Sequence, residues 1–257
     1  MIHPTAIIDP QAKLGPGVTV GPYSVIGPQV EIGEGTEIAN QVTVLGPTRI
    51  GKNNRFYTGS SIGQDPQDKK YRHGEDSRLE MGDGNTVREF CTINRGTELG
   101  GGLTRVGHRN WIMATVHIAH DVIVGDDTVI ANNTALGGHA IIGDKVVLGG
   151  FAAVHQFCRI GAYTITGAQS MIPQDVPPFL TVAGNRAKPY GVNSTGLERN
   201  GFTPEQVKTI QKAYKIFYRS KLGQAEALER LEKELGADPN VQTFIAFIRQ
   251  STRGVLR

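Results

Sequence analysis

The stretch VGPYSVIGPQVEIGEGTEI, residues 20–38, carries an aliphatic residue every six positions, at Val20, Ile26, Ile32 and Ile38. Each of these residues is followed by glycine or alanine. The same step of six gives 24 positions between residues 14 and 172, of which 23 are apolar. A chain with 39% hydrophobic residues would give about nine by composition alone. The period of six is therefore a property of the fold.

A period of six matches neither an isolated helix nor an alternating strand, and it is typical of a parallel β-helix. Three hexads form one triangular coil, with the aliphatic residue pointing inward and the small residue at the corner. Coils stack roughly 4.8 Å apart, so 24 hexads predict about eight coils and a prism roughly 40 Å long. We expect an all-β left-handed parallel β-helix over residues 1–190 and a C-terminal α-helical domain over residues 191–257.

Two polar segments, residues 64–78 and 97–105, leave the six-residue period. Insertions of this kind project from one side of a solenoid and often carry function, although a tolerated surface loop is the alternative interpretation. The period ends near Pro173. The sequence TPEQ at 203–206 then predicts the capped start of a helix. Two further helices are expected at residues 224–235 and 239–251.

Composition indicates a soluble globular protein, because 20% of residues are charged and no apolar run is long enough for a membrane span. The start, MIHPTAIIDP, lacks the features of a signal peptide, so a cytoplasmic location is expected. Cys91 and Cys158 are expected to be reduced, packed thiols. Residues 191–257 hold 11 Lys/Arg against 7 Asp/Glu, which indicates either a solvated surface or a docking site for an acidic partner. No nucleic-acid partner is expected.

Histidines gather in one part of the predicted prism. One lap of the prism takes three hexads, or 18 residues, so residues 18 apart in sequence lie on neighbouring coils. Gly138 should therefore lie beside His120, and His139 beside Asp121. Gly138 has no side chain and leaves its backbone N–H accessible. An imidazole beside a bare N–H suits acyl transfer, because the imidazole takes the proton of an attacking hydroxyl while the N–H stabilises the developing oxyanion. Four of the seven histidines share this region: His117, His120, His139 and His155.

Two other interpretations of these histidines remain open. Each could be an ordinary hydrogen-bonded residue of a non-catalytic β-helix scaffold. Three histidines could also bind zinc, as in the carbonic anhydrases of this fold, which requires nitrogens converging at about 2.0–2.1 Å from the metal. Because a glycine, and no histidine, lies directly beside His120, we expect neither a metal nor a cofactor.

Several longer motifs point to one family. The chain resembles the UDP-N-acetylglucosamine O-acyltransferases, which take the first step of lipid A synthesis in Gram-negative bacteria. The resemblance extends nearly from end to end, with the motifs in the same order. These motifs are HIAHD (117–121), NNTALGGH (132–139), AVHQFCRIGA (153–162), QDVPPF (174–179), YGVNSTGLERNGF (190–202) and STRGVLR (251–257).

The resemblance implies that an (R)-3-hydroxyacyl chain passes from acyl carrier protein to the 3-hydroxyl of UDP-N-acetylglucosamine. His120 would be the general base, and Gly138 would supply the oxyanion N–H. Asp121 would orient or polarise the base, although adjacent strand residues point apart, which argues against a direct contact. Ala168 matches the closed end of the acyl groove. The positions that match substrate contacts are Asp68, Lys70, His117, His139, Gln156, Asn193 and Arg199, with His155 in a supporting role.

The family is a homotrimer with active sites between subunits, and the same assembly is implied here. Asn94, Arg186 and Asn200 depart from residues frequent in the family. The sequence leaves open the acyl-chain length and an amine acceptor, such as a 3-amino sugar nucleotide. The N-acylating relative of the same pathway carries an additional N-terminal domain. Here the hexads begin at Ile2, which argues against that version.

Overall fold

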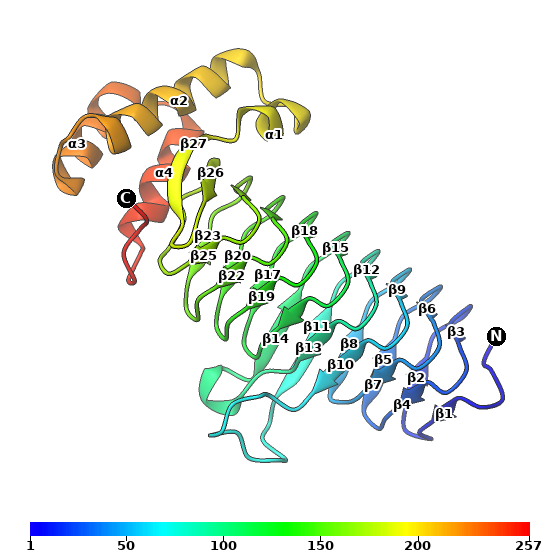
Figure 1. The fold of residues 1–257 in the computed structure, drawn as a ribbon. Helices are drawn as coiled ribbons and strands as arrows, with labels where there is room; N and C mark the ends of the chain where they lie inside the picture. The colour runs from blue at the N-terminus through cyan, green and yellow to red at the C-terminus, as the bar shows by residue number, and fades with distance from the viewer.

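The computed structural model describes residues 1–257 as a triangular prism of stacked coils with helices at its C-terminal end (Figure 1). The fold is a left-handed parallel β-helix, as predicted. Three sheets, which we call A, B and C, form the faces of the prism.

Sheet A consists of β3 (Thr19–Val20), β6 (Glu37–Ile38), β9 (Arg55–Phe56), β12 (Thr86–Val87), β15 (Trp111–Ile112), β18 (Val129–Ile130), β21 (Val147–Leu148), β24 (Ile165–Thr166), β26 (Leu180–Ala183) and β27 (Lys188–Val192). Sheet B consists of β1 (Ile7–Ile8), β4 (Val25–Ile26), β7 (Thr43–Val44), β10 (Ser61–Gln64), β13 (Thr92–Asn94), β16 (His117–Ile118), β19 (Ala135–Leu136), β22 (Ala153–Val154) and β25 (Met171–Ile172). Sheet C consists of β2 (Lys13–Leu14), β5 (Val30–Ile32), β8 (Thr48–Ile50), β11 (Arg78–Met81), β14 (Leu103–Val106), β17 (Ile123–Val124), β20 (Ile141–Ile142) and β23 (Arg159–Ile160).

The predicted lap of three hexads is confirmed by the strand register. Ile118 pairs with Leu136 in sheet B, and both side chains are fully buried. Each inward residue thus leaves water and packs on the residues one lap before and after it, which stabilises the fold by about 1.5–3 kcal/mol per large aliphatic side chain. Thr166 is the polar exception among the inward positions, and its buried hydroxyl accepts a hydrogen bond from the Gly149 N–H at 3.0 Å.

The prism is longer than the prediction of about eight coils that ended near Pro173. Strand β1 lies where the hexads that begin at Ile2 predict the start of the stack, whereas β26 pairs in parallel with β24 beyond the predicted end. Val176 also forms a parallel bridge with Ile160. The chain therefore continues the prism beyond Pro173 without keeping an aliphatic residue at every sixth position, which is why the period did not reveal this lap.

Two loops project from the prism on the same side, where sheets B and C meet (Figure 1). The first loop spans residues 65–77 between β10 and β11, and the second spans residues 95–102 between β13 and β14. The predicted range of 97–105 for the second loop was wrong at its end. Its last residues belong to β14, because they pair with the strand that follows the first loop.

Helices α1 (Ser194–Arg199), α2 (Pro204–Arg219), α3 (Gln224–Leu235) and α4 (Pro239–Arg249) follow the prism. The capping box at the start of α2 is confirmed, with Thr203 as N-cap and Gln206 closing it. Neither α1 nor the antiparallel strand β27 was predicted, since both are short and carry little apolar periodicity. Strand β27 crosses residue 190, where the sequence placed the domain boundary.

The C-terminal segment returns to the prism. Ser251 donates to a carboxylate oxygen of Asp175 at 2.7 Å, and the Leu256 N–H donates to the Asp175 carbonyl at 2.8 Å. Cys91 and Cys158 are free and buried, as predicted, and burial raises the pKa of each thiol to about 11. None of the helices combines the length and the apolar character needed to span a membrane.

Candidate active site

The site lies at the corner between sheets B and C, beside the two loops. Asp121, His139 and Phe157 occupy the same corner position on three successive coils, and each has a left-handed backbone with φ between 60° and 64°. Strand β16 ends at Ile118, so residues 120 and 121 belong to a turn. The expectation that His120 and Asp121 would point apart as strand neighbours was therefore wrong. The turn directs both side chains to the same side of the corner.

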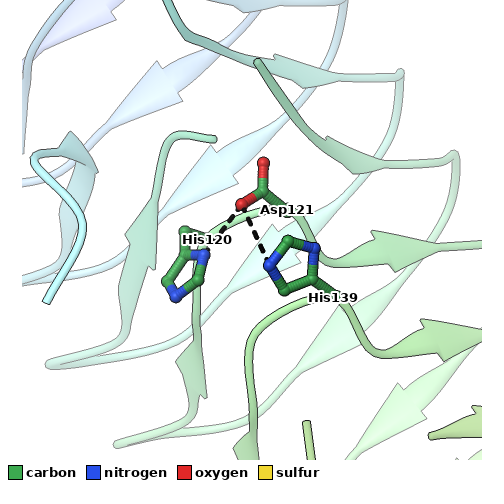
Figure 2. Close-up of side chains that lie close together, drawn as sticks. All are labelled: His120, Asp121 and His139. Atoms are coloured by element: carbon green, nitrogen blue, oxygen red, sulfur yellow. Dashed lines mark hydrogen bonds and ion pairs between the residues drawn. The ribbon is translucent and has the colours of Figure 1, made fainter. Parts of the chain in front are cut away.

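His120 and Asp121 form a direct hydrogen bond (Figure 2). Their atoms Nδ1 and Oδ2 are 2.8 Å apart. An ionised carboxylate can only accept, so Nδ1 of His120 carries a proton, and in the neutral imidazole Nε2 keeps its lone pair. This is the protonation state that a general base requires. The same carboxylate oxygen lies 3.6 Å from Nε2 of His139.

Asp121 is held as an anion in a dry environment, since the residue is only 6% exposed. Burial alone would raise the pKa of Asp121, but hydrogen bonds from His120 and Thr97 outweigh burial and hold this pKa below its ordinary value. Thr97 donates from both its backbone N–H and its hydroxyl, at 2.9 and 2.7 Å. The Asp121 N–H in turn donates to the hydroxyl of Thr104 at 2.8 Å.

Gly138 lies beside the imidazole of His120, as the predicted lap requires. A Cβ added to Gly138 would stand 2.6 Å from Cε1 and 2.8 Å from Nε2 of His120. The Gly138 carbonyl accepts from Phe157, whereas its N–H has no partner among the backbone hydrogen bonds. The residue with the unpaired N–H therefore lies directly beside the basic nitrogen, with no side chain between them.

Burial lowers the pKa of His139 at this corner and of His117 in the adjoining strand β16, which favours the neutral imidazole. Burial lowers the pKa of His139 below its ordinary value, against the opposing attraction of Asp121. The ring of His139 stacks on Phe157, with centroids 4.3 Å apart, and meets the ring of His120 edge to face. Burial and then the neighbouring His120 lower the pKa of His117, whose Nδ1 lies 2.7 Å from the hydroxyl of Thr92. Neutral imidazoles can bind hydroxyl groups of a sugar without adding charge.

A cleft of about 580 Å³ opens in front of the dyad, a size that suits a small-molecule ligand. Residues of both loops and of the corner line it. The lining residues are Gln67, Asp68, Lys70, Tyr71, Glu75, Thr97, Leu99, Gly100, His120, His139, Gln156 and Phe157. The structure thus brings four predicted substrate contacts to the predicted base, namely Asp68, Lys70, His139 and Gln156.

The first loop is fixed to the prism by Arg95, which is 5% exposed. Its guanidinium pairs with the carboxylate of Asp65 and donates to the hydroxyl of Tyr71 at 3.0 Å and to the Gly63 carbonyl at 2.8 Å. A buried charge that is paired in this way resists loop opening, because separation would leave the guanidinium without these partners. Arg95 therefore determines where the loop places Asp68 and its neighbours.

His120, Asp121 and His139 also form a group whose potential metal-ligand atoms lie within 4.8 Å of one another. The chemistry of the group is that of a hydrogen-bonded dyad. Oδ2 of Asp121 accepts from both His120 and Thr97, and Oδ1 accepts from the Thr97 N–H. A metal at the centre of the group would have to displace the proton on Nδ1 that gives His120 its free Nε2.

Comparison with known proteins decides the family. A family model described as UDP-N-acetylglucosamine O-acyltransferase, domain 2, matches residues 175–256, and a bacterial transferase hexapeptide model matches residues 1–33 and 103–138. The acyl-[acyl-carrier-protein]–UDP-N-acetylglucosamine O-acyltransferase of Halorhodospira halophila is 51% identical over 256 residues, covering 100% of this chain and 99% of that protein. The chain belongs to the UDP-N-acetylglucosamine O-acyltransferase family. A relative of the same name from Herminiimonas arsenicoxydans is 51% identical over 261 residues, with coverage of 100% and 99%.

Solved structures of this acyltransferase family share the whole fold. The UDP-N-acetylglucosamine O-acyltransferase of Moraxella catarrhalis superposes with a TM-score of 0.97 at 44% identity, covering 100% of this chain and 99% of that one. The Acinetobacter baumannii protein gives a TM-score of 0.96 at 43% identity, with the same coverage. The resemblance seen in the motifs is thus confirmed over the full length of the chain.

Four residues carried over from the acyltransferase resemblance lie away from the cleft, and a fifth, His117, lies next to it. His155 is exposed and its Nδ1 lies 2.9 Å from the guanidinium of Arg253. Asn193 caps α1 and donates to the Tyr163 carbonyl at 2.8 Å. The other two are exposed residues, with Arg199 at the end of α1 and Ala168 at the corner between sheets A and B. His117 lies in sheet B next to the cleft but does not line it.

Sequence reasoning about this acyltransferase missed several residues of the site, of which Phe157, Thr97 and Arg95 make the contacts described above. Phe157 lies one lap after His139 and stacks on its ring, so the lap length could have placed it on the cleft wall. Thr97 and Arg95 belong to the second loop, which leaves the repeat. No position in the lap predicts their contacts, and only the structure reveals them.

Proposed function

We propose that the chain transfers an (R)-3-hydroxyacyl group from the thioester of acyl carrier protein to the 3-hydroxyl of UDP-N-acetylglucosamine. The observation that carries this proposal is the position of Gly138, whose N–H has no backbone partner, directly beside Nε2 of His120. One group removes a proton and the other stabilises negative charge on oxygen, which are the two requirements of acyl transfer to a hydroxyl. The names of the relatives, which specify both substrates, support this assignment.

In this mechanism Nε2 of His120 takes the proton of the sugar 3-hydroxyl as its oxygen attacks the thioester carbonyl. The carbonyl oxygen becomes negative and accepts a hydrogen bond from the Gly138 N–H. The imidazolium that forms is stabilised by the anionic carboxylate of Asp121, which accepts a hydrogen bond from its Nδ1–H. The tetrahedral intermediate then expels the carrier thiolate, which receives the proton from Nε2. All groups return to their starting state, and no cofactor enters the balance.

The cleft supplies part of the substrate contacts. Asp68 and Lys70 on the first loop, with His139 and Gln156 on the coils, offer polar groups for the sugar nucleotide and the donor. Asn193 and Arg199 lie away from this cleft, next to the C-terminal helices. Their proposed roles therefore require a second copy of the chain, in agreement with a homotrimer whose sites lie between subunits.

Several finer features belong to the same proposal. His155 would support Gln156 from the neighbouring position, and His117 would contact the nucleotide sugar beside the cleft. Ala168 would close the acyl groove and so influence chain length. The basic C-terminal region would bind the acidic carrier protein, and the reaction would take place in the cytoplasm.

The test mixes purified protein with UDP-N-acetylglucosamine and hydroxyacyl carrier proteins of several chain lengths, and detects the acylated sugar nucleotide by mass spectrometry. His120→Ala should lower kcat by about 10²–10⁴-fold, the usual contribution of a general base. His3→Ala changes an exposed histidine far from the cleft and should leave the rate unchanged. Normal turnover by His120→Ala would show that the base is another residue, and no transfer at any chain length would refute the function.

Two further arms separate the alternatives. A 3-amino sugar nucleotide, assayed beside the hydroxyl substrate, shows whether the acceptor is an amine. Elemental analysis and a chelator test the zinc alternative, which requires stoichiometric metal and loss of activity on chelation.

Light scattering in solution tests the trimer, for which the mass should be three times 27.7 kDa.

A further inference from the structure

The second loop surrounds the carboxylate of Asp121. We propose that Thr97, on this loop, is a positioning residue that fixes the Asp121 carboxylate and thereby fixes which nitrogen of His120 is free to act as base. Thr97 acts through Asp121 and has no role of its own in the chemistry. The inference rests on the proposed function for its kinetic test and on the structure alone for its spectroscopic test.

The contacts of Thr97 occupy both oxygens of the carboxylate. Its N–H donates to Oδ1 at 2.9 Å, and its hydroxyl donates to Oδ2 at 2.7 Å. Oδ2 is also the atom that accepts from Nδ1 of His120, at 2.8 Å. Thr97 and Asp121 are 7% and 6% exposed, so water does not compete for these bonds. Hydrogen bonds to a charged group in such a dry environment are the strong ones.

The direction of the Thr97 hydroxyl is itself fixed. Its oxygen accepts from the Gly100 N–H at 3.0 Å, as the N-cap of the short helix η1 (Glu98–Gly100). With a lone pair engaged there, the hydroxyl hydrogen is directed to Asp121. The loop can approach this closely only because two of its residues lack side chains. A Cβ on Gly96 would stand 2.8 Å from Oδ1, and one on Gly100 would stand closer still to Oδ2.

A carboxylate bound at both oxygens cannot rotate about its bond to Cβ. Oδ2 of Asp121 therefore stays in line with Nδ1 of His120, and the proton stays on Nδ1. Nε2 then keeps its lone pair on the side that faces Gly138. Without the Thr97 hydroxyl, the carboxylate could turn, and His120 could adopt the tautomer in which Nε2 carries the proton and cannot accept another.

The kinetic test compares two substitutions of Thr97. Thr97→Val replaces the hydroxyl by a methyl group of similar size and should lower kcat by about 10–100-fold, which corresponds to about 1.4–2.8 kcal/mol. The KM for both substrates should change by less than about two-fold, because Thr97 acts on the base and not on binding. Thr97→Ser keeps the hydroxyl and should retain most of the activity. If Thr97→Val does not fold, Thr97→Ala removes the same hydroxyl without adding bulk.

Thr36→Val is the matched control for the loss of a buried hydroxyl. Thr36 is fully buried, donates to the Gly51 carbonyl at 3.1 Å and accepts from the Asn54 N–H at 3.2 Å. It thus both donates and accepts, as Thr97 does, but lies several laps from the cleft. Thr36→Val should lower Tm by an amount similar to Thr97→Val and leave kcat unchanged. A fall in kcat with Thr36→Val would attribute both losses to stability and overturn the proposal.

A double-mutant cycle tests whether Thr97 acts through Asp121. Once Asp121→Ala has removed the carboxylate, adding Thr97→Val should cost nothing further. If Thr97→Val costs the same factor with and without the carboxylate, the proposal is wrong.

The nitrogen-15 shifts of the His120 ring give a readout that needs no turnover. Wild type and Thr97→Ser should show the Nδ1–H tautomer, and Thr97→Val should show a mixture. An unchanged tautomer in Thr97→Val would refute the positioning role. If wild type transfers no acyl group, the proposed function fails, while these shifts still decide the role of Thr97.

Discussion

Replacing Gly138 by alanine tests the central geometry of the site. The added Cβ would stand 2.6 Å from Cε1 of His120, whereas ordinary contacts begin near 3.4 Å, so the imidazole must move by about 0.8 Å. The methyl group would also cover the N–H that is proposed to stabilise the oxyanion. A misplacement of about 1 Å costs roughly 10²-fold in rate. We therefore expect Gly138→Ala to lower kcat by about 10²-fold.

The fold should tolerate this substitution. The φ angle of Gly138 lies outside the left-handed region, so alanine can adopt the same backbone conformation. Ala168 occupies the same turn position at another corner of the prism, which shows that a methyl group fits this turn. Tm should therefore change by only a few degrees, since replacing glycine at a compatible position alters stability by about 0.4–1 kcal/mol.

Steady-state kinetics and thermal unfolding of Gly138→Ala should be compared with those of Gly150→Ala. Gly150 occupies the equivalent turn position on another corner, where an added Cβ would meet no atom closer than 3.4 Å. We expect Gly150→Ala to keep both kcat and Tm. If Gly138→Ala retained wild-type kcat, the imidazole would not need its observed position, and the assignment of the base and the oxyanion donor would be refuted.

Three further predictions concern stability and protonation. Arg95→Met should lower the free energy of unfolding by about 2–3 kcal/mol and raise KM, because it removes the ion pair between Arg95 and Asp65 that holds the first loop. As a control, Arg49→Met changes an exposed residue and should alter stability by less than about 0.5 kcal/mol. Chemical denaturation measures both variants. Ile130→Ala should cost about 2–5 kcal/mol, because the side chain is fully buried, while Ile7→Ala, at 65% exposure, should cost far less. His117 should titrate below its ordinary value of 6.5 in NMR, because burial lowers its pKa. Its contribution to stability is then complete above pH 6.5 and lost as the pH falls through the folded-state pKa; a midpoint at or above 6.5 would contradict this.

Much of the fold could be predicted because one number, the six-residue period, fixes both the shape of a coil and the register of the next. The pairing of Ile118 with Leu136 follows from that number alone. The same reasoning placed Gly138 beside His120, which is the most informative contact of the site. The end of the prism was misjudged, since β26 joins sheet A without a preceding hexad.

The rest of the site could not be predicted because it depends on turns and loops outside the repeat. The contact between His120 and Asp121 arises from a left-handed turn, which the rule for strand neighbours does not describe. Thr97 and Arg95 lie on a loop whose path is determined by glycines and by its contacts with the first loop. Their sequence separation from the groups they bind bears no fixed relation to distance in space.

The strict register of the coils also limits how the length of this protein can change. Removing or duplicating one complete turn of the stack, for example residues 21–38, would shorten or lengthen the rod by roughly 4.8 Å and leave every downstream side chain facing the same way. A single extra residue within a strand would instead turn the following side chains from the interior to solvent. Natural or engineered variants should therefore differ in length by whole turns of the stack in this region, with irregular insertions confined to the loops.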